Sequence, residues 1–293
     1  MKIVFIGAVA FSADVLLELI EMKAEIVGVF TLTKTSFNAD HRDLSDIANS
    51  AGIPVYEAID INAAENLDLI KDWMPDVIFC FGWSRLIKRP LLDIPRIGVV
   101  GFHPTALPAN RGRHPLVWAL VLGLSETAST FFFMNEEADA GDILSQKMVL
   151  ISCKDDAKSL YEKITKTALS QIREFVPTLI TGRFQRTAQR TNNANNWRKR
   201  GHIDGQIDWR MAAESIHNLV RGLTHPYLGA HFDFEGKSIK VWRTKVVKDI
   251  PLNIEPGKVL ESGSKGPLVK AGIGAIRLLK IEPQVSLKTG IYL

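Results

Sequence analysis

Residues 99–146 read VVGFHPTALPANRGRHPLVWALVLGLSETASTFFFMNEEADAGDILSQ, and the fold of the chain is organised around them. An apolar run ends directly at His103. A second apolar run, residues 130–134, is followed by an acidic turn that holds Asp139. A histidine and a carboxylate that each end a strand can meet in space while lying far apart in sequence. The stretch therefore predicts a general acid/base site at one edge of a sheet.

The residues before this stretch predict a parallel, doubly wound α/β sheet of the Rossmann-like kind. Short apolar runs alternate with segments of helical periodicity, which is typical of βαβ units. The expected strands are residues 2–7, 25–31, 53–56 and 76–81. Sheets of this class bind ligands beyond the carboxyl ends of their strands, where we expect His103 and Asp139. Residues 7–10, GAVA, lack the spacing of a dinucleotide fingerprint, so we do not expect a nicotinamide or flavin enzyme.

The residues after it predict a long helix and then a second, smaller domain. Apolar residues recur at helical spacing over residues 157–180, whereas residues 182–202 are polar and predict an interdomain connection on the surface. Short strand-like runs separated by glycines then predict a small OB-like β-barrel. The expected division is a catalytic domain at 1–185, a linker at 186–205 and a C-terminal domain at 206–293.

Composition indicates an ordinary globular protein that suits an anionic ligand. Of its 293 residues, 46% are hydrophobic and 23% charged, and the net charge is +4. No dense block of lysine and arginine singles out nucleic acid as a partner. No apolar stretch reaches the ~20 residues of a membrane span and no signal peptide is visible, so we expect a cytoplasmic protein. Its two cysteines predict no disulfide framework, and we expect no metal site.

Three motifs of the central stretch resemble one enzyme family when they are taken together. Residues 101–108 read GFHPTALP, Arg111 and Gly112 form a turn, and residues 139–141 read DAG. They are similar to the Asn-x-His-Pro-Ser-Leu-Leu-Pro-like run, the Arg-Gly turn and the Asp-x-Gly turn of formyltransferases that use 10-formyltetrahydrofolate. The resemblance extends to residues 204–257, which are similar to the barrel domain that follows the catalytic domain in some members.

The resemblance implies catalytic roles for His103 and Asp139. Formyl transfer requires that the attacking amine lose a proton and that the tetrahedral oxyanion be stabilised. His103 stands at the family's proton-transfer position, and Asp139 would orient its ring and favour its protonated form. The structural alternatives are a buried histidine bonded to backbone and a plain turn residue before Gly141.

Gly101 departs from the family pattern. The family places an asparagine at this catalytic position, and its amide would hydrogen-bond the formyl oxygen. The loss of one such donor typically costs ~3 kcal/mol of transition-state stabilisation. A backbone N–H, water or neighbouring side chain could replace it, the chain could belong to a differently built subfamily, or the protein could be impaired.

The resemblance also implies a binding site for the folate donor. It would comprise the loop after the fourth strand, the acidic turn and one arginine from the basic loop at residues 107–115. The matching residues are Arg85, Leu86, Ile87, Arg113, Asn135, Glu136, Glu137, Ala138 and Asp139. Leu86 and Ile87 have a simpler interpretation as core residues that lead a helix.

Two classes of acceptor amine compete, methionyl-tRNA and a nucleotide-linked amino sugar. A loop that holds tRNA should be basic, but in residues 33–43 the charges of Lys34 and Arg42 are offset by Asp40 and Asp43. Residues 111–118, RGRHPLVW, are similar to the Arg-Gly-Arg-x-Pro-Leu-x-Trp pattern of the sugar-modifying members. We therefore expect the acceptor to be a nucleotide-linked amino sugar that serves as a glycan precursor. We do not expect nucleic acid as a partner.

Tyr227 is the substrate-binding candidate in the C-terminal half. Residues 224–229, THPYLG, also resemble the sugar enzymes, and the ring of Tyr227 could stack on a base or a sugar, or pack at a domain interface. Methionyl-tRNA formylation is the first alternative. The second, a degenerate module that binds folate or sugar without catalysis, rests on Gly101. The sequence leaves the oligomeric state open, with a homodimer as one alternative.

Overall fold

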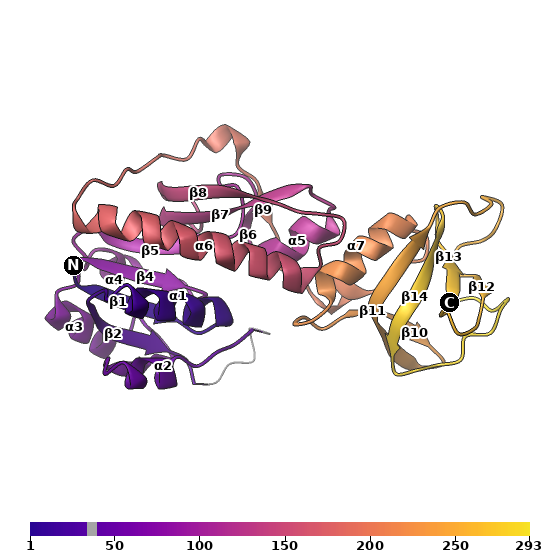
Figure 1. Ribbon diagram of the computed structural model, residues 1–293, viewed down its shortest axis with the longest axis horizontal. Coiled ribbons are helices and arrows are strands. Elements are labelled where there is room, and N and C mark those ends of the chain that lie inside the picture. Colours follow the sequence, from indigo (N-terminus) through magenta and orange to yellow (C-terminus); the bar gives the residue numbers. More distant parts are fainter. Residues whose placement is uncertain (34–39) are drawn as a thin grey trace. The chain divides into compact units, whose positions relative to one another are not determined.

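The structure, a computed structural model, describes residues 1–33 and 40–293 and divides into two compact units (Figure 1). The first unit comprises Met1–Gly112, Thr127–Val149 and Lys163–Trp197. The second comprises Arg113–Glu126, Leu150–Glu162 and Arg198–Leu293. The chain thus contributes three segments to each unit. In the loop at residues 33–43, whose charges offset each other, residues 34–39 lie outside the described residues, and Lys34 is one of them.

The first unit is built on a seven-stranded sheet with the order β3-β2-β1-β4-β5-β7-β8. These strands are β1 (Ile3–Gly7), β2 (Ile26–Thr31), β3 (Val55–Glu57), β4 (Val77–Phe81), β5 (Gly98–His103), β7 (Glu126–Phe133) and β8 (Ile143–Leu150). The first five strands in sheet order pair in parallel, whereas β7 runs antiparallel to β5. The predicted Rossmann-like sheet is therefore confirmed, with an antiparallel extension that the sequence analysis did not foresee.

Helices cover both faces of this sheet. They are α1 (Ala10–Glu21), α2 (Ser45–Ser50), α3 (Ala64–Trp73), α4 (Arg89–Leu92) and α6 (Ala157–Ile180). In Figure 1, α1 and α6 run side by side, and the guanidinium of Arg173 on α6 binds the carboxylate of Glu18 on α1 through two hydrogen bonds of 2.6 and 2.5 Å. The predicted helix over residues 157–180 is confirmed.

Alternation along the strands gives the two faces different cores. Phe79 on β4 contacts Phe175 of α6 edge-on, with ring centroids 6.2 Å apart. The opposite face is mostly aliphatic, and there Val99 belongs to one buried cluster with Ile70 of α3 and Leu91 of α4. Side chains two residues apart on a strand share a face. Gly101 and His103 therefore lie on the same face of β5 as Val99.

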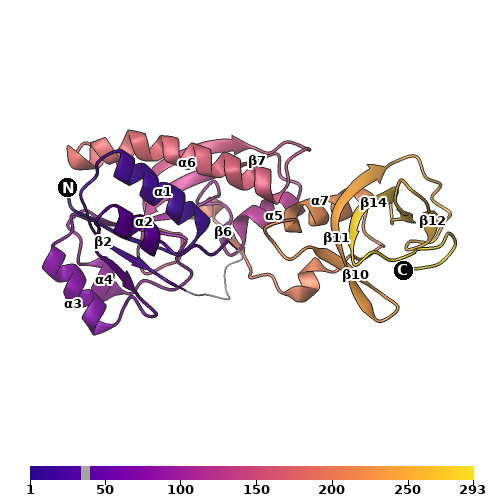
Figure 2. The same ribbon diagram turned by 60° about the horizontal axis from the view of Figure 1, so that its bottom comes forward.

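The second unit is a five-stranded antiparallel sheet with helix α7 packed on it (Figure 2). The sheet has the order β10-β11-β14-β13-β12. The strands are β10 (Ala230–Phe234), β11 (Lys237–Val247), β12 (Val259–Glu261), β13 (Leu268–Lys270) and β14 (Ala275–Glu282), and the helices of this unit include α5 (Pro115–Val121) and α7 (Ala213–Leu223). Ile216, Leu219 and Val220 form the buried side of α7 within the core of this unit. The short strands predicted for the C-terminal part of the chain are present, and they pair as one antiparallel sheet.

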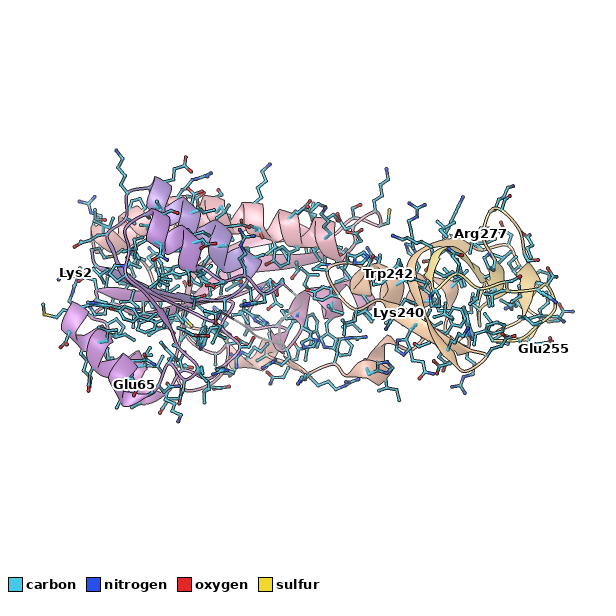
Figure 3. All side chains as sticks on the ribbon, turned by 90° about the horizontal axis from the view of Figure 1, so that it is seen from below. Lys2, Glu65, Lys240, Trp242, Glu255 and Arg277 are labelled. Atoms are coloured by element: carbon cyan, nitrogen blue, oxygen red, sulfur yellow. The ribbon has the colours of Figure 1, made fainter. Side chains whose placement is uncertain are left out.

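Trp242 on β11 supports the turn that precedes β10 (Figure 3). Its ring stacks on His225 at a centroid distance of 4.1 Å, and its Nε1 donates to Glu282 of β14 at 3.0 Å. A Cβ added at Gly229 would lie 3.1 Å from the same ring, and the φ of Gly229 is +81°. Glycine thus allows the turn containing Tyr227 to pack closely against β11.

Both cysteines are free thiols, Cys80 buried and Cys153 exposed. Burial raises the pKa of the Cys80 thiol to about 12, as expected of an inert core residue. No helix in the described part of the chain combines the length and hydrophobicity that crossing a membrane requires.

Candidate active site

His103 occupies the carboxyl end of β5, and both nitrogens of its buried ring face oxygen atoms. Nε2 lies 2.9 Å from the carbonyl oxygen of Asn110, and Nδ1 lies 3.7 Å from Oδ1 of Asp139. Because a carbonyl oxygen only accepts hydrogen bonds, Nε2 carries the hydrogen of the neutral ring. Nδ1 then bears the lone pair and faces Asp139. The predicted meeting of this histidine and this carboxylate is present in the structure.

The carboxylate of Asp139 is held by the backbone on its other side. Its Oδ2 accepts a hydrogen bond of 2.9 Å from the N–H of Gly112, which lies in the short strand β6 (Arg111–Gly112). Strand β6 pairs in parallel with β9 (Asn196–Trp197). A Cβ on Gly112 would lie 2.3 Å from the carbonyl oxygen of Trp197, and its φ is +105°. Only glycine fits this position, which explains the Arg-Gly turn.

Two residues of the site have a left-handed backbone. Asn110 has φ +65° and Asp139 has φ +58°. Such conformations are uncommon for residues other than glycine and are often found at functional sites. The N–H of Asn110 donates to the side chain of Asn195 at 2.7 Å, which fixes the carbonyl that His103 contacts.

Gln189 joins the Asp139 turn to Arg111, and sequence reasoning did not identify it. Its Nε2 donates to the carbonyl oxygens of Asp139 and Gly141 at 2.9 and 2.7 Å. Its Oε1 accepts from Nη2 and Nε of Arg111 at 2.8 and 3.3 Å. The amide thereby uses both donors and both acceptor positions. Arg111 is buried and also pairs with Glu137 at 3.1 Å.

Two apolar side chains crowd the space that a side chain at Gly101 would occupy. A Cβ added to Gly101 would lie 2.9 Å from Cγ of Met134 and 3.0 Å from Cζ of Phe132. Phe132 is buried and stands opposite Gly101 in the antiparallel β5–β7 pair. The space next to the strand is thus filled by two apolar side chains. The surroundings of Gly101 are packed for glycine.

The loop after β4 holds the first group of donor candidates. Ile87 is buried in the aliphatic core, whereas Arg85 and Leu86 are exposed. Asn62 fixes this loop, because its Nδ2 donates to the carbonyl oxygen of Leu86 at 3.0 Å and its Oδ1 accepts from the N–H of Lys88 at 2.8 Å. Ile87 is therefore a core residue, as its simpler interpretation predicted. Leu86 is exposed and remains available to a ligand.

The acidic turn between β7 and β8 supplies the second group of donor candidates. The side chain of Asn135 accepts from the N–H of Glu137 at 3.0 Å, which forms an Asx turn. Arg89, at the start of α4, lies 3.6 Å from the carboxylate of Glu136, so the two loops approach each other. Ala138, which is exposed, and Asp139, which is partly buried, complete the turn.

One buried donor within the loop after β4 lacks a partner. Nε1 of Trp83 has no hydrogen-bond partner among residues 1–33 and 40–293. Unpaired buried polar groups are rare and costly in folded proteins. An acceptor atom of a bound ligand would satisfy this N–H.

The remaining two candidates, Arg113 and Tyr227, belong to the second unit. Arg113 is exposed, and Tyr227 is partly buried in the turn that Trp242 supports. The N–H of Tyr227 donates to the carbonyl oxygen of Thr224 at 3.0 Å. Among the described residues, no group of three or more histidine, cysteine, aspartate or glutamate side chains could hold a metal ion.

Comparison with known proteins identifies relatives along the whole chain. Residues 1–176 match the formyl transferase family, and residues 201–288 match the formyl transferase C-terminal domain. A methionyl-tRNA formyltransferase from Geobacter sulfurreducens is 30% identical over 299 residues, covering 100% of this chain and 93% of the relative.

Two solved structures share the fold at low sequence identity. The sugar 3N-formyl transferase WlaRD, solved in the presence of dTDP and 5-N-formyl-THF, has a TM-score of 0.72 at 15% identity and covers 97% of this chain and 99% of its own. HypX from Aquifex aeolicus in complex with tetrahydrofolic acid has a TM-score of 0.68 at 19% identity and covers 96% of this chain. This chain covers 44% of HypX, less than half of its length.

Proposed function

Because the chain belongs to the formyl transferase family, we propose that this enzyme formylates the amine of a nucleotide-activated amino sugar. The formyl donor of the family is 10-formyltetrahydrofolate. The observation that carries the choice of acceptor is the run RGRHPLVW at residues 111–118, which is similar to the pattern of sugar-modifying members.

His103 is the proposed proton-transfer residue. The hydrogen bond from Nε2 to Asn110 leaves Nδ1 as the basic atom, facing Asp139. Nδ1 accepts the proton that the amine loses as its nitrogen bonds to the formyl carbon, and returns it to the folate nitrogen that leaves. The carboxylate of Asp139 stabilises the imidazolium between these transfers. Once protonated, Nδ1–H also supplies a donor in a site where Gly101 has no side chain.

The donor site proposed for reduced folate comprises Arg85, Leu86, Ile87 and residues 135–139 of the first unit, whereas Arg113 belongs to the second unit. The residues present suit such a ligand, because the exposed Leu86 offers apolar contact and the unpaired Nε1 of Trp83 offers a hydrogen bond. A pterin carries several acceptor atoms that could use this donor. Tyr227 is the proposed stacking residue for the acceptor base or sugar.

Methionyl-tRNA is the second candidate acceptor, and the full-length similarity to methionyl-tRNA formyltransferases at 30% identity favours it. A direct competition decides between the two. We would measure kcat/KM for a panel of nucleotide-linked amino sugars and for charged initiator tRNA, with 10-formyltetrahydrofolate as donor. We expect the higher value on an amino sugar, and a higher value on the tRNA would reverse the assignment.

The same experiment tests the third alternative, a binding module without activity. A 5-formyl folate analogue should bind at micromolar concentration and inhibit the reaction. If it binds while neither acceptor is formylated under any condition, the chain is a binding protein and the proposed function is wrong.

A further inference from the structure

A cluster of cationic side chains follows the two paired strands that support Asp139. Beyond β6 the chain continues with Arg113 and His114, and beyond β9 it continues with residues 198–200, Arg-Lys-Arg. All five residues belong to the second unit, and we call them the basic cluster. It begins one residue after Gly112, whose N–H binds the carboxylate of Asp139.

Trp118 of α5 organises one side of the basic cluster. Its Nε1 donates to the carbonyl oxygen of Arg198 at 3.0 Å. The guanidinium carbon of Arg200 lies 4.5 Å from the centroid of the Trp118 ring, and that of Arg198 lies 5.4 Å from it. Contacts of this type favour cations over the face of an indole. The tryptophan of the RGRHPLVW run thus places two arginines of the cluster.

The neighbouring carboxylate of Asp204 cannot neutralise all the positive charge of the basic cluster. Both oxygens of Asp204 bind Arg198, and Oδ2 also accepts from the N–H of Gly201 at 2.7 Å. The buried Arg200 donates only to the carbonyl oxygen of Asp204 among the described residues. Among residues 1–33 and 40–293, no carboxylate lies within 4 Å of the charged nitrogens of Arg113, Lys199 or Arg200 to form an ion pair. The charge of Asp204 acts on Arg200 as well, but its carboxylate is bound to Arg198, so a bound anion would further lower the cost of the buried guanidinium.

The charges of the cluster converge on His114. Burial is the main cause that lowers the pKa of His114, and the nearby charges of Arg113, Arg200 and Lys199 lower it further, against a smaller opposing effect of Asp204. Burial likewise lowers the pKa of Arg200. The charges of three cations from two separate segments therefore act on one half-buried histidine.

We propose that the basic cluster binds the pyrophosphate group of the nucleotide-linked acceptor, an inference that rests on the proposed function. In a nucleotide-linked sugar the pyrophosphate group carries two negative charges, which the three cations that form no ion pair within 4 Å can neutralise. Such a site would bind the acceptor through a part that does not react. Binding energy from such a remote group serves to orient the amine.

The first test measures the binding of inorganic pyrophosphate to the full chain by calorimetry at constant ionic strength. Lys199→Ala removes an exposed charge, and Arg200→Gln removes the buried one. We expect each to weaken binding about tenfold, whereas Lys280→Ala, which removes an exposed charge on β14, should leave it unchanged. Equal affinity of the wild type and Lys199→Ala, with Lys199→Glu also unchanged, would overturn the proposal even if Arg200→Gln does not fold.

The second test follows His114 by NMR, with His114→Gln to assign its signal. Pyrophosphate neutralises the surrounding cations, so its binding should raise the pKa of His114, and Lys199→Ala should reduce this rise. No change in the titration of His114 at saturating pyrophosphate contradicts the site.

A third arm distinguishes the phosphate from the glutamate tail of the donor, which is the other anion in the reaction. If a γ-linked triglutamate peptide binds as tightly as pyrophosphate and loses affinity in the same variants, the cluster serves the donor and the proposal is wrong. These binding measurements do not depend on formyl transfer. Loss of pyrophosphate binding in the variants combined with formylation of tRNA alone would support the site and refute the amino-sugar acceptor.

Discussion

Nε2 of Gln189 donates a hydrogen bond of 2.9 Å to the carbonyl oxygen of Asp139, across 50 residues of sequence. The same amide binds the carbonyl of Gly141 and the guanidinium of the buried Arg111. The turn that carries the proposed catalytic carboxylate is therefore fixed from behind. Since Asp139 also has a left-handed backbone, its position depends on such support.

Replacement of Gln189 should impair turnover more than substrate binding. Gln189→Met keeps the length of the side chain but removes all four hydrogen bonds, so we expect kcat to fall about 10- to 100-fold, with KM for both substrates nearly unchanged. Steady-state kinetics provide the measurement. Gln284→Met, which removes a hydrogen bond of 3.3 Å to Ile281 in the second unit, is the control and should retain the wild-type kcat. A normal kcat in Gln189→Met would show that the turn keeps its position without the amide.

Introduction of the family asparagine at Gly101 should be harmful. The Cβ alone approaches Met134 and Phe132 to 2.9 and 3.0 Å, so Gly101→Asn should lower the free energy of unfolding by about 1–3 kcal/mol and reduce turnover. Urea denaturation and kinetics at the same temperature test this. The control is Gly182→Asn, because a Cβ at Gly182 meets nothing within 4 Å and asparagine tolerates its φ of +70°. An increase in turnover would show that the site retains space for an oxyanion-binding amide.

Local patterns predicted the parallel strands and the place of His103. Alternating apolar runs specify buried strands, and the last residue of a parallel strand lies at the carboxyl edge of the sheet. Asp139 meets His103 by a different route from the predicted one, because β7 is antiparallel and ends opposite Val100, near the start of β5. The turn after β7 brings Asp139 back to His103. The direction of β7 was not predictable in this way. Strand direction depends on long-range pairing, and the run at residues 130–134 has the same pattern in either orientation.

Gln189 and Asn62 could not be predicted for a different reason. Both lie in polar segments without periodicity, and their roles come from hydrogen bonds to backbone atoms far away in sequence. Such contacts leave no local signal, because any polar side chain fits the pattern equally well. The packing around Gly101 was likewise hidden, since it depends on the register that places Phe132 opposite this glycine.

Acid should weaken the ion pair between Asp204 and Arg198 of the basic cluster. Hydrogen bonds from Arg198 and from the N–H of Gly201 hold the pKa of the Asp204 carboxyl well below its usual range. A carboxyl with a lowered folded-state pKa stabilises the protein above its unfolded pKa of ~3.9, and this contribution is lost as pH falls toward the folded value. Asp204→Asn should therefore lower the free energy of unfolding by about 1 kcal/mol at pH 7, and by less near pH 3.

Denaturant titrations of the wild type and Asp204→Asn across this pH range would measure the effect. Asp249→Asn is the control, since Asp249 lies in an exposed loop and its replacement should give no pH-dependent difference. A destabilisation by Asp204→Asn that is the same at pH 3 and pH 7 contradicts the electrostatic explanation.

Removal of either member of the proton-transfer pair should abolish most activity and leave the donor site intact. His103→Ala deletes the base, so we expect kcat to fall ~10²–10⁴-fold, with little change in affinity for a 5-formyl folate analogue. Asp139→Asn should also lose rate, because a neutral amide cannot stabilise an imidazolium, although its oxygen can still accept the hydrogen bond from Gly112. His217→Gln, at a partly buried histidine of α7 whose Nδ1 lies 2.9 Å from Oγ1 of Thr244, is the matched control and should keep a comparable kcat. Single-turnover kinetics separate the chemical step from product release, and a wild-type rate of that step in His103→Ala would refute the proposed mechanism.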